Sequence, residues 1–230
     1  MIKNRSHWTC HKCLSSGEQR PQSAAGLRVL NLYAGIGGNR KFWNGCHVTA
    51  VERDVHVAAA YKYLYPEDTL IVGDAHQYLL KNYQNFDFIW SSPPCQSHSR
   101  MNYWLPAHKK IYVDLSLYQQ VIFLREFFRG SWVVENVNPY YLPLVAPDKR
   151  IGRHCFWTNF SISDFEIEQI PGFINLDTPE DKESIMKWLG IRYDKNIYLS
   201  GKSYLQVFRN CVHPDIGLSI FNDFITSRRF

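Results

Sequence analysis

Short apolar runs alternate with longer amphipathic stretches along the chain from residue 27 onward. The runs are rich in branched and aromatic residues and end at Gly, Pro or acidic residues, which is typical of buried strands. They predict strands over residues 27–32, 48–51, 70–72, 86–90 and 131–134. Apolar residues at helical spacing predict helices that close over residues 61–65 and extend over residues 115–128, 185–189 and 215–224. This alternation predicts an α/β protein with a doubly wound, largely parallel sheet.

Residues 1–26 lack this alternation and are polar, rich in Ser, Gln, Gly and Arg. They predict a mobile amino-terminal arm ahead of a single domain over residues 27–230. Cys10 and Cys13 have the spacing of half a zinc knuckle, and His7 offers a third ligand. Because no second Cys or His pair follows at the spacing of a zinc ribbon, we favour two exposed thiols and predict no metal site.

Composition narrows the class of protein. A chain of 230 residues that is 45% hydrophobic and 20% charged can bury one good core. The net charge of +5 favours a polyanionic partner, although only weakly. Six cysteines, no cationic and apolar leader, and no apolar run near the ~20 residues of a membrane span predict a soluble protein in a reducing compartment.

Three consecutive predicted strands end in residues suited to a nucleotide-like ligand. The first runs into the glycine-rich turn 33–39, where the backbone can approach a ligand closely at a helix start. Residue 40 is Arg where the dinucleotide fingerprint has Gly, which argues against NAD. The second strand ends at Glu52, placed to bond ribose hydroxyls, and the third at Asp74. Each feature alone is an ordinary turn or exposed acid, but the ordered set predicts a nucleoside-containing cofactor.

Cys95 follows the fourth predicted strand and a stiff Pro pair, at the strand end where open α/β sheets bind ligands. A lone cysteine is more often structural than catalytic, yet Glu135 stands at the end of the fifth strand, potentially across a crevice from it. Residues 100–110 interleave basic and aromatic side chains that could contact phosphates and fill the space left by a displaced base. A solvated loop is nearly as good an interpretation of that stretch.

Together these motifs resemble the DNA (cytosine-5) methyltransferases that depend on S-adenosylmethionine. YAGIGG resembles the first motif of that family, VERD the second, VGDA the third, SPPCQSHS the nucleophile motif and WVVENV the ENV motif. Arg153 in GRHCFWTN resembles the arginine motif, and RNCVHPDIG resembles the final Asn-x-Val element. The resemblance covers about residues 27–160 and 205–221. Its specific part is PPCQ followed by ENV at this distance.

The resemblance implies a Rossmann-like class I fold and three catalytic residues. Cys95, as thiolate, would add to C6 of cytosine, Glu135 would hold N3, and Arg153 would contact the ring carbonyl oxygen or a phosphate. S-adenosylmethionine is the expected cofactor, with Glu52 on its ribose and Asp74 on its adenine amino group. The residues expected to line its site are Tyr33, Ala34, Gly35, Ile36, Gly37, Gly38, Glu52, Asp74, Pro94 and Asn210.

The sequence departs from the family pattern at several places. Ser92 stands where Gly is usual and His98 where Phe is usual, and the arginine motif keeps one Arg. Residues 164–204 are few for a target-recognition region, so we predict a reduced insert with short or relaxed specificity. A partner subunit could supply the missing reading surface.

Double-stranded DNA is the expected substrate, with the target cytosine flipped out because C6 is inaccessible in a stacked duplex. Relatives with the same PPC and ENV motifs modify tRNA, so an RNA methyltransferase is one alternative. A catalytically silent DNA-binding or regulatory protein of the same fold is another. We further expect a cytoplasmic, nucleoid-associated monomer in a prokaryotic or phage-infected cell, with a specificity partner or cognate nuclease as a candidate companion. The sequence predicts neither the recognised bases nor the nuclease.

Overall fold

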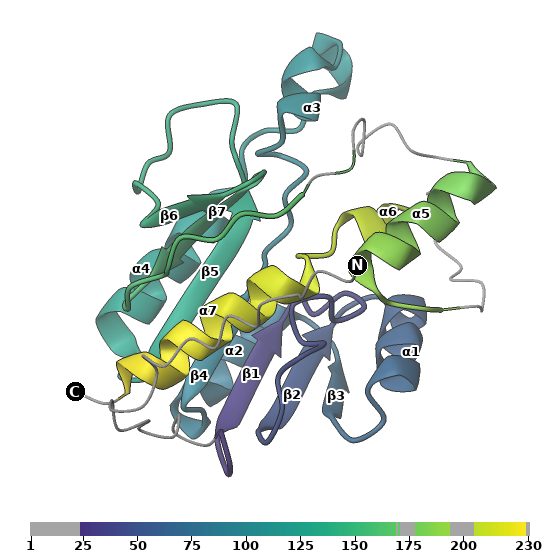
Figure 1. Ribbon diagram of the computed structural model, residues 1–230. Coiled ribbons are helices and arrows are strands. Elements are labelled where there is room, and N and C mark those ends of the chain that lie inside the picture. The colour runs from purple at the N-terminus through teal and green to yellow at the C-terminus, as the bar shows by residue number, and fades with distance from the viewer. Residues whose placement is uncertain (1–23, 169, 171–177, 194–204, 229–230) are drawn as a thin grey trace, which may run out of the picture.

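The computed structural model describes residues 24–168, 170, 178–193 and 205–228 (Figure 1). The predicted amino-terminal arm up to residue 23, with Cys10 and Cys13, lies outside the described residues, as does much of the predicted recognition insert. The strands are β1 (Arg28–Leu32), β2 (His47–Glu52), β3 (Thr69–Val72), β4 (Phe88–Ser91), β5 (Ser131–Val137), β6 (Lys149–Ile151) and β7 (His154–Thr158). The helices are α1 (Val55–Leu64), α2 (Ala75–Asn82), α3 (Arg100–Trp104), α4 (Ser116–Phe127), α5 (Pro179–Leu189), α6 (Leu205–Arg209) and α7 (Pro214–Ser227), with 3-10 turns η1 (Tyr83–Asn85) and η2 (Ala107–Lys109).

The strands form one sheet in the order β3-β2-β1-β4-β5-β7-β6. Neighbours from β3 to β5 pair in parallel, whereas β7 pairs antiparallel with both β5 and β6. The chain builds outward from β1 to β3 and then returns to place β4 on the other side of β1. The strand order therefore reverses between β1 and β4, the position at which doubly wound sheets bind ligands. The predicted Rossmann-like, mostly parallel fold is confirmed.

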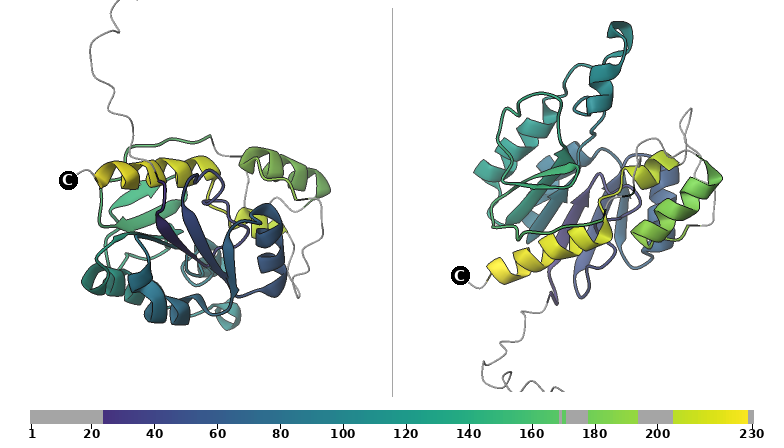
Figure 2. Two further views of the ribbon diagram at one scale, coloured as in Figure 1. Left: turned by 90° about the horizontal axis from the view of Figure 1, so that it is seen from below. Right: turned by 45° about the horizontal axis from the view of Figure 1, so that its top comes forward.

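Helices cover both faces of this sheet (Figures 1 and 2). On one face α7 buries apolar side chains against β1 and β4, and the Trp43 ring stacks on Phe221 with centroids 5.2 Å apart. On the other face α2 and α4 pack through residues such as Leu79 and Val121 against alternate positions of the same strands. Because a parallel sheet is buried on both faces, its strands carry apolar side chains on both sides. None of the helices within the described ranges is long and apolar enough to span a membrane.

The β6–β7 hairpin was not predicted from the sequence, and it changes the position of Glu135. β5 continues to Val137 rather than ending at residue 134, because Glu135 pairs with Phe156 on β7. The expectation that Glu135 stands at a strand tip is therefore wrong: it lies inside a paired strand. A β5–β7 ladder holds its backbone on the side opposite the parallel ladder with β4.

The glycine-rich turn after β1 does not open a helix, contrary to the sequence-based expectation. Residues 34–43 form successive turns, with Gly37 N bonded to Ala34 O and Trp43 N bonded to Arg40 O. Gly35 and Gly37 both have positive φ, a conformation that favours glycine. A side chain at Gly37 would also collide with the rings of Tyr61 and Tyr65.

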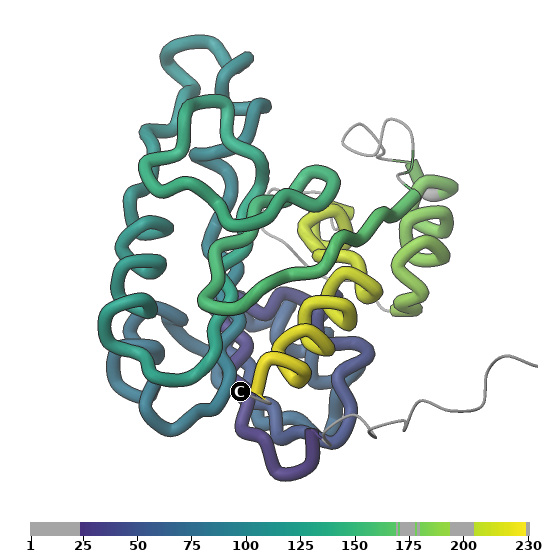
Figure 3. Tube along the Cα trace, turned by 60° about the vertical axis from the view of Figure 1, so that its left-hand side comes forward, coloured from purple at the N-terminus to yellow at the C-terminus, as the bar shows by residue number. Residues whose placement is uncertain are grey.

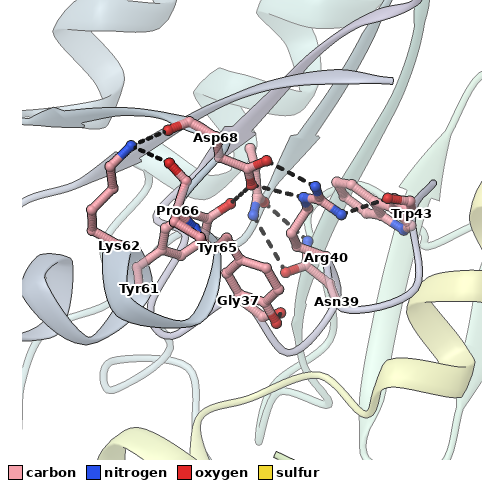
Figure 4. A network of polar contacts seen from close by, with 10 residues as sticks. Gly37, Asn39, Arg40, Trp43, Tyr61, Lys62, Tyr65, Pro66 and Asp68 are labelled. Carbon is pink, nitrogen blue, oxygen red and sulfur yellow. Dashed lines mark hydrogen bonds and ion pairs between the residues drawn. The ribbon is translucent and has the colours of Figure 1, made fainter. Parts of the chain in front are cut away.

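Arg40 anchors this turn through a buried ion pair (Figure 4). Its Nε and Nη2 donate to the two oxygens of Asp68 at 2.7 and 2.8 Å, and its Nη1 donates to Trp43 O at 2.5 Å. Tyr61 donates to Asp68 at 2.7 Å, while Tyr65 donates to Gly37 O at 2.7 Å. Arg40, which argued against a dinucleotide fingerprint, therefore connects the turn to the segment between α1 and β3.

An extended segment over residues 159–168 leads from β7 along α7 toward α5 (Figure 3). Ser163 bonds Asp223 of α7 through both its backbone N and its hydroxyl. Helix α5 is longer than the predicted 185–189, because Thr178 and Asp181 form a capping box that starts it earlier. Its Ile185 and Leu189 pack with α1 and α6, so part of the expected recognition insert contributes to the core.

Candidate active site

A cavity of about 560 Å³ opens beside the carboxyl ends of β1 and β4, where the strand order reverses. The cavity lies between the glycine-rich turn, the loop after β4, the β5–β7 ladder and the segment before α7. Of the predicted site residues, Gly37 alone is not part of its lining, because it lies under the two tyrosine rings. The predicted residues that line it are Tyr33, Ala34, Gly35, Ile36, Gly38, Glu52, Asp74, Pro94, Cys95, Glu135, Arg153 and Asn210.

Glu52 braces the glycine-rich turn. One oxygen of its carboxylate accepts from Gly35 N at 2.9 Å, and the other accepts from Arg53 N at 2.8 Å and Asp54 N at 2.9 Å. Asp54 in turn caps α1 by accepting from His56 N and Val57 N. An ionised carboxylate has about four acceptor positions, so Glu52 retains acceptor capacity for a ligand in the cavity.

Asp74 has a second task that the sequence pattern did not indicate. Its Oδ1 accepts from Gln77 N at 2.9 Å and so caps the amino terminus of α2. This bond fixes the side chain at the rim of the cavity. The cap also explains why a helix begins directly after β3.

Tyr33 connects the two halves of the cavity. Its backbone has φ of +54°, a conformation that non-glycine residues rarely adopt and that is often associated with functional sites. Its hydroxyl accepts from Gln120 Nε2 at 2.7 Å, and Gln120 accepts from Ser91 at the end of β4. Burial raises the pKa of the Tyr33 hydroxyl to about 12, so it stays protonated at neutral pH.

Cys95 is held on a rigid loop after β4. Asn136 on β5 donates to Pro93 O at 2.9 Å, and Cys95 O accepts from the backbone N of His98 and of Ser99 at 3.0 Å each. Burial and then the charge of Glu135 raise the pKa of the Cys95 thiol to about 11, against a lowering effect of Arg153. The thiol is therefore protonated near neutral pH.

Arg153 lies in the turn between β6 and β7 and fixes the carboxyl-terminal wall of the cavity. Its Nη2 donates to the carbonyl oxygens of Arg209 and, at 3.3 Å, of Cys211, the residues on either side of Asn210. Burial lowers the pKa of the Arg153 guanidinium, whereas the charges of Glu135 and Cys95 raise it. Arg153, Glu135 and Cys95 thus influence one another electrostatically within a single site.

His154 directly contacts the Glu135 carboxylate, and sequence reasoning missed it. Its Nδ1 lies 2.5 Å from Glu135 Oε1, and the two side chains are 7% and 8% exposed. In the β5–β7 ladder Val137 pairs with His154 and Glu135 with Phe156. Positions 135 and 154 are therefore diagonal neighbours on one face of the ladder. No sequence signal could have brought them together without the β7 strand.

Residues 27–110 match the family model for C-5 cytosine-specific DNA methylases. The chain is similar to this methylase family. No curated protein matches it. Three solved structures that resemble it in part are a SAM-dependent methyltransferase from Agrobacterium tumefaciens, DNMT2 from Spodoptera frugiperda and the methyltransferase EhMeth from Entamoeba histolytica.

The first of these is 18% identical over 50% of this chain and 40% of its own, with a TM-score of 0.37. The second, an E260A/E261A/K263A mutant, is 21% identical over 64% and 56%, with a TM-score of 0.39. The third is 11% identical over 89% and 99%, with a TM-score of 0.49. This chain therefore spans less than two thirds of the length of the first two.

The methylase match covers part of the candidate site. It includes the glycine-rich turn, Glu52, Asp74 and Cys95, and it ends at residue 110. Glu135 and Arg153 lie beyond it, so their association with the site rests on the cavity that they line with Cys95.

Proposed function

We propose that this protein transfers a methyl group from S-adenosylmethionine to C5 of a flipped-out cytosine in DNA, through a covalent bond between Cys95 and C6. The observation that carries the proposal is the convergence of Cys95, Glu135 and Arg153 in one cavity with the Glu52-braced turn. A nucleophile, a carboxyl group and a cation beside a nucleoside site are what this chemistry requires.

The residues on the β1–β3 side fit S-adenosylmethionine. Glu52 offers acceptors for ribose hydroxyls, and Asp74, fixed by its capping bond, offers an acceptor for an amino group. At Gly35 the space where a Cβ would stand has no atom within 4 Å, so the backbone is open to a ligand there. The bound cofactor would supply an electrophilic methyl group on a sulfonium.

The residues on the β4–β7 side fit a two-stage activation of the ring. Cytosine C5 is a weak nucleophile, and addition of the Cys95 thiolate at C6 moves an electron pair toward N3 and C5. Glu135 delivers a proton to N3 as that charge develops. C5 would then take the methyl group as its bond to the sulfonium sulfur breaks, with the electron pair left on sulfur. Loss of the C5 proton to a solvent base, departure of the Cys95 thiolate and return of the N3 proton to Glu135 restore the neutral aromatic ring.

Electrostatics decides when the thiolate forms. Because the Glu135 charge raises the pKa of Cys95 and Arg153 lowers it, a protonated Glu135 beside a charged Arg153 is the state that favours the thiolate. The same state is the one able to donate to N3. Substrate protonation and nucleophile activation therefore depend on one carboxyl group.

The segment after Cys95 supports nucleic acid as the partner. Residues 100–113 include Arg100, Lys109 and Lys110 and contain no acidic residue. Trp104 is 78% exposed, and Lys110 Nζ lies 5.2 Å from the centre of the Tyr103 ring. Figure 2 (right) shows α3 projecting beyond the sheet. Exposed aromatic rings among cations can stack on bases while phosphates are neutralised.

The reduced insert leaves little described surface for reading bases. Because α5 packs against α1 and α6, we infer short or relaxed specificity or a partner that supplies further contacts. The proposal includes action as a monomer on DNA in the cytoplasm. It also includes a specificity partner or a cognate nuclease as a companion.

Two assays with the purified protein test the proposal. Labelled S-adenosylmethionine is incubated with duplex DNA or with tRNA, and we expect label in DNA. Label confined to tRNA would identify the alternative substrate. A duplex carrying 5-fluorocytosine should give a cofactor-dependent covalent adduct, since fluorine cannot leave as the C5 proton does. The absence of adduct and of transfer on either substrate would favour a catalytically silent protein.

A further inference from the structure

The Glu135 carboxyl group contacts His154, a residue that the proposed reaction does not itself require. His154 Nδ1 lies 2.5 Å from Glu135 Oε1, and more than nine-tenths of each side chain is buried. Such a short contact between a carboxyl oxygen and an imidazole nitrogen requires a hydrogen between them. Two bare lone pairs at this distance would repel one another.

The two oxygens of the Glu135 carboxyl group have different surroundings. Oε1 is directed to His154, whereas Oε2 has no hydrogen-bond partner among the residues that the structure describes. Glu135 lines the cavity together with Cys95 and Arg153. Oε2 is therefore the oxygen that can meet a ring in the cavity.

The remaining groups around the pair do not compete for Oε1. Arg153 donates to the carbonyl oxygens of Arg209 and Cys211, and among the described residues no hydrogen bond joins Cys95 to Glu135. Asn136, the next residue of β5, donates instead to Pro93 O. Within the described ranges His154 is the one side chain bonded to the Glu135 carboxyl group.

We propose that His154 is a positioning residue, which donates its Nδ1 hydrogen to Glu135 Oε1 and so presents Oε2 to N3 of the substrate ring. This inference rests on the proposed function and adds to it the residue that orients the carboxyl group. When Glu135 gives up its proton to N3, the Nδ1 hydrogen bond strengthens to the carboxylate that remains. His154 itself need not gain or lose a proton.

Variants at position 154 separate orientation from packing. His154→Asn places an amide N–H near the position of Nδ1, whereas His154→Leu fills similar space without a donor. We expect the Leu variant to lose roughly 10- to 100-fold in kcat for methyl transfer, the order of loss that misplacement of a reacting group causes. The Asn variant should recover most of that loss, and KM for S-adenosylmethionine should be unchanged in both.

A double-mutant cycle with Glu135→Gln tests whether His154 acts through Glu135. If it does, His154→Leu causes little further loss in the Glu135→Gln background, because the group that it orients is no longer an acid. Equal fractional losses in both backgrounds would overturn the proposal. Cofactor binding by each purified variant shows that it is folded, and Asn, which retains a partner for the buried carboxylate, serves if the Leu variant does not fold.

A measurement independent of activity keeps this inference distinct from the proposed function. In protein labelled with ¹⁵N-histidine, the His154 signals, assigned by their loss in His154→Asn, should show a hydrogen on Nδ1. An unprotonated Nδ1 in the wild-type protein refutes the positioning role even if methyl transfer is observed. Conversely, an inactive wild-type protein with Nδ1 protonated would contradict the proposed function and leave the Glu135–His154 geometry correct.

Discussion

The two walls of the cavity are built in different ways. On the β1–β3 wall, the ligand-facing groups come from short local turns, each braced by bonds to nearby backbone, as Glu52 is bonded to Gly35. On the β4–β7 wall, Cys95, Glu135 and Arg153 come from three distant segments and meet only through the sheet. In the proposed function the first wall, here called the binding wall, holds the cofactor. The second, here called the reactive wall, carries the chemistry, and on it the pKa values of Cys95 and Arg153 respond to burial and to neighbouring charge.

The largest expected effect lies on the reactive wall. Replacing Cys95 by Ser removes the proposed nucleophile, and methyl transfer should fall by about 10⁴-fold or more, the order seen when a nucleophile that acts in a unit is removed. Binding of S-adenosylmethionine, measured by calorimetry, should be unchanged, because most of the expected cofactor contacts, Glu52 and Asp74 among them, lie on the other wall. Residual transfer within tenfold of wild type would show that the comparison between the walls is wrong.

The binding wall should instead respond through stability. Arg40 and Asp68 are 13% and 4% exposed, so Arg40→Met leaves a buried carboxylate without its cation. We expect a loss of about 3–5 kcal/mol in the free energy of unfolding, measured by urea denaturation. The matched control is Arg28→Met, which breaks the exposed Arg28–Asp87 pair and should cost less than about 1 kcal/mol. Equal losses would contradict a special role for the Arg40 network.

This difference between the walls also explains what could be predicted from the sequence. The glycine-rich turn, Glu52 and Asp74 lie at strand ends that hydrophobic runs reveal, so their shared position follows from a parallel sheet. The helix predicted to start at the glycine-rich turn does not form, because Arg40 and the tyrosines fold the turn on itself. The hairpin strand β6 has three residues and gave no hydrophobic signal.

The reactive wall was predicted only as a set of residue types. Arg153 and Glu135 were assigned by resemblance, and their joint access to the cavity depends on β7 running antiparallel beside β5. His154 could not be predicted, because it comes next to Glu135 only through the β5–β7 ladder, in which Glu135 pairs with Phe156, two residues further along β7. Interactions between residues far apart in the sequence leave no local pattern, whereas turn and cap residues do.

A smaller effect is expected on helix α3, which follows the Cys95 loop in the chain. Trp104 is 78% exposed and its ring lies against Tyr103 with centroids 5.3 Å apart. Trp104→Ala should weaken binding of a DNA duplex with an abasic target site by ~1–3 kcal/mol, the usual contribution of one base stacked on an aromatic ring. Thermal stability should stay within error. Phe127→Ala on α4, which is also an exposed aromatic residue, should leave DNA affinity unchanged.

The smallest effect concerns the ionisation of one thiol. Arg153 lowers the pKa of Cys95 against the effects of burial and of Glu135, so Arg153→Gln should raise that pKa further. At a fixed pH of about 8 the thiolate fraction of Cys95, and with it the rate of alkylation by iodoacetamide, should fall roughly tenfold, the change that one pH unit produces. Arg153→Lys keeps the charge and should retain most of the rate.

Arg150 on β6 provides a control for charge at the same hairpin. Burial raises the pKa of the Cys155 thiol, and Arg150, whose Nη1 lies 3.1 Å from Cys155 Sγ, opposes that rise. Arg150 is not among the groups that shift the pKa of Cys95. Cys155 is buried, so the readout is Cys95 alone: Arg150→Gln should leave its alkylation rate unaffected, as peptide mass spectrometry can resolve. If both substitutions slow Cys95 equally, the thiol responds to the net charge of the hairpin. In that case the reactive wall would be tuned by a diffuse field, and the specific placement of Arg153 beside Cys95 and Glu135 would not be required for thiolate formation.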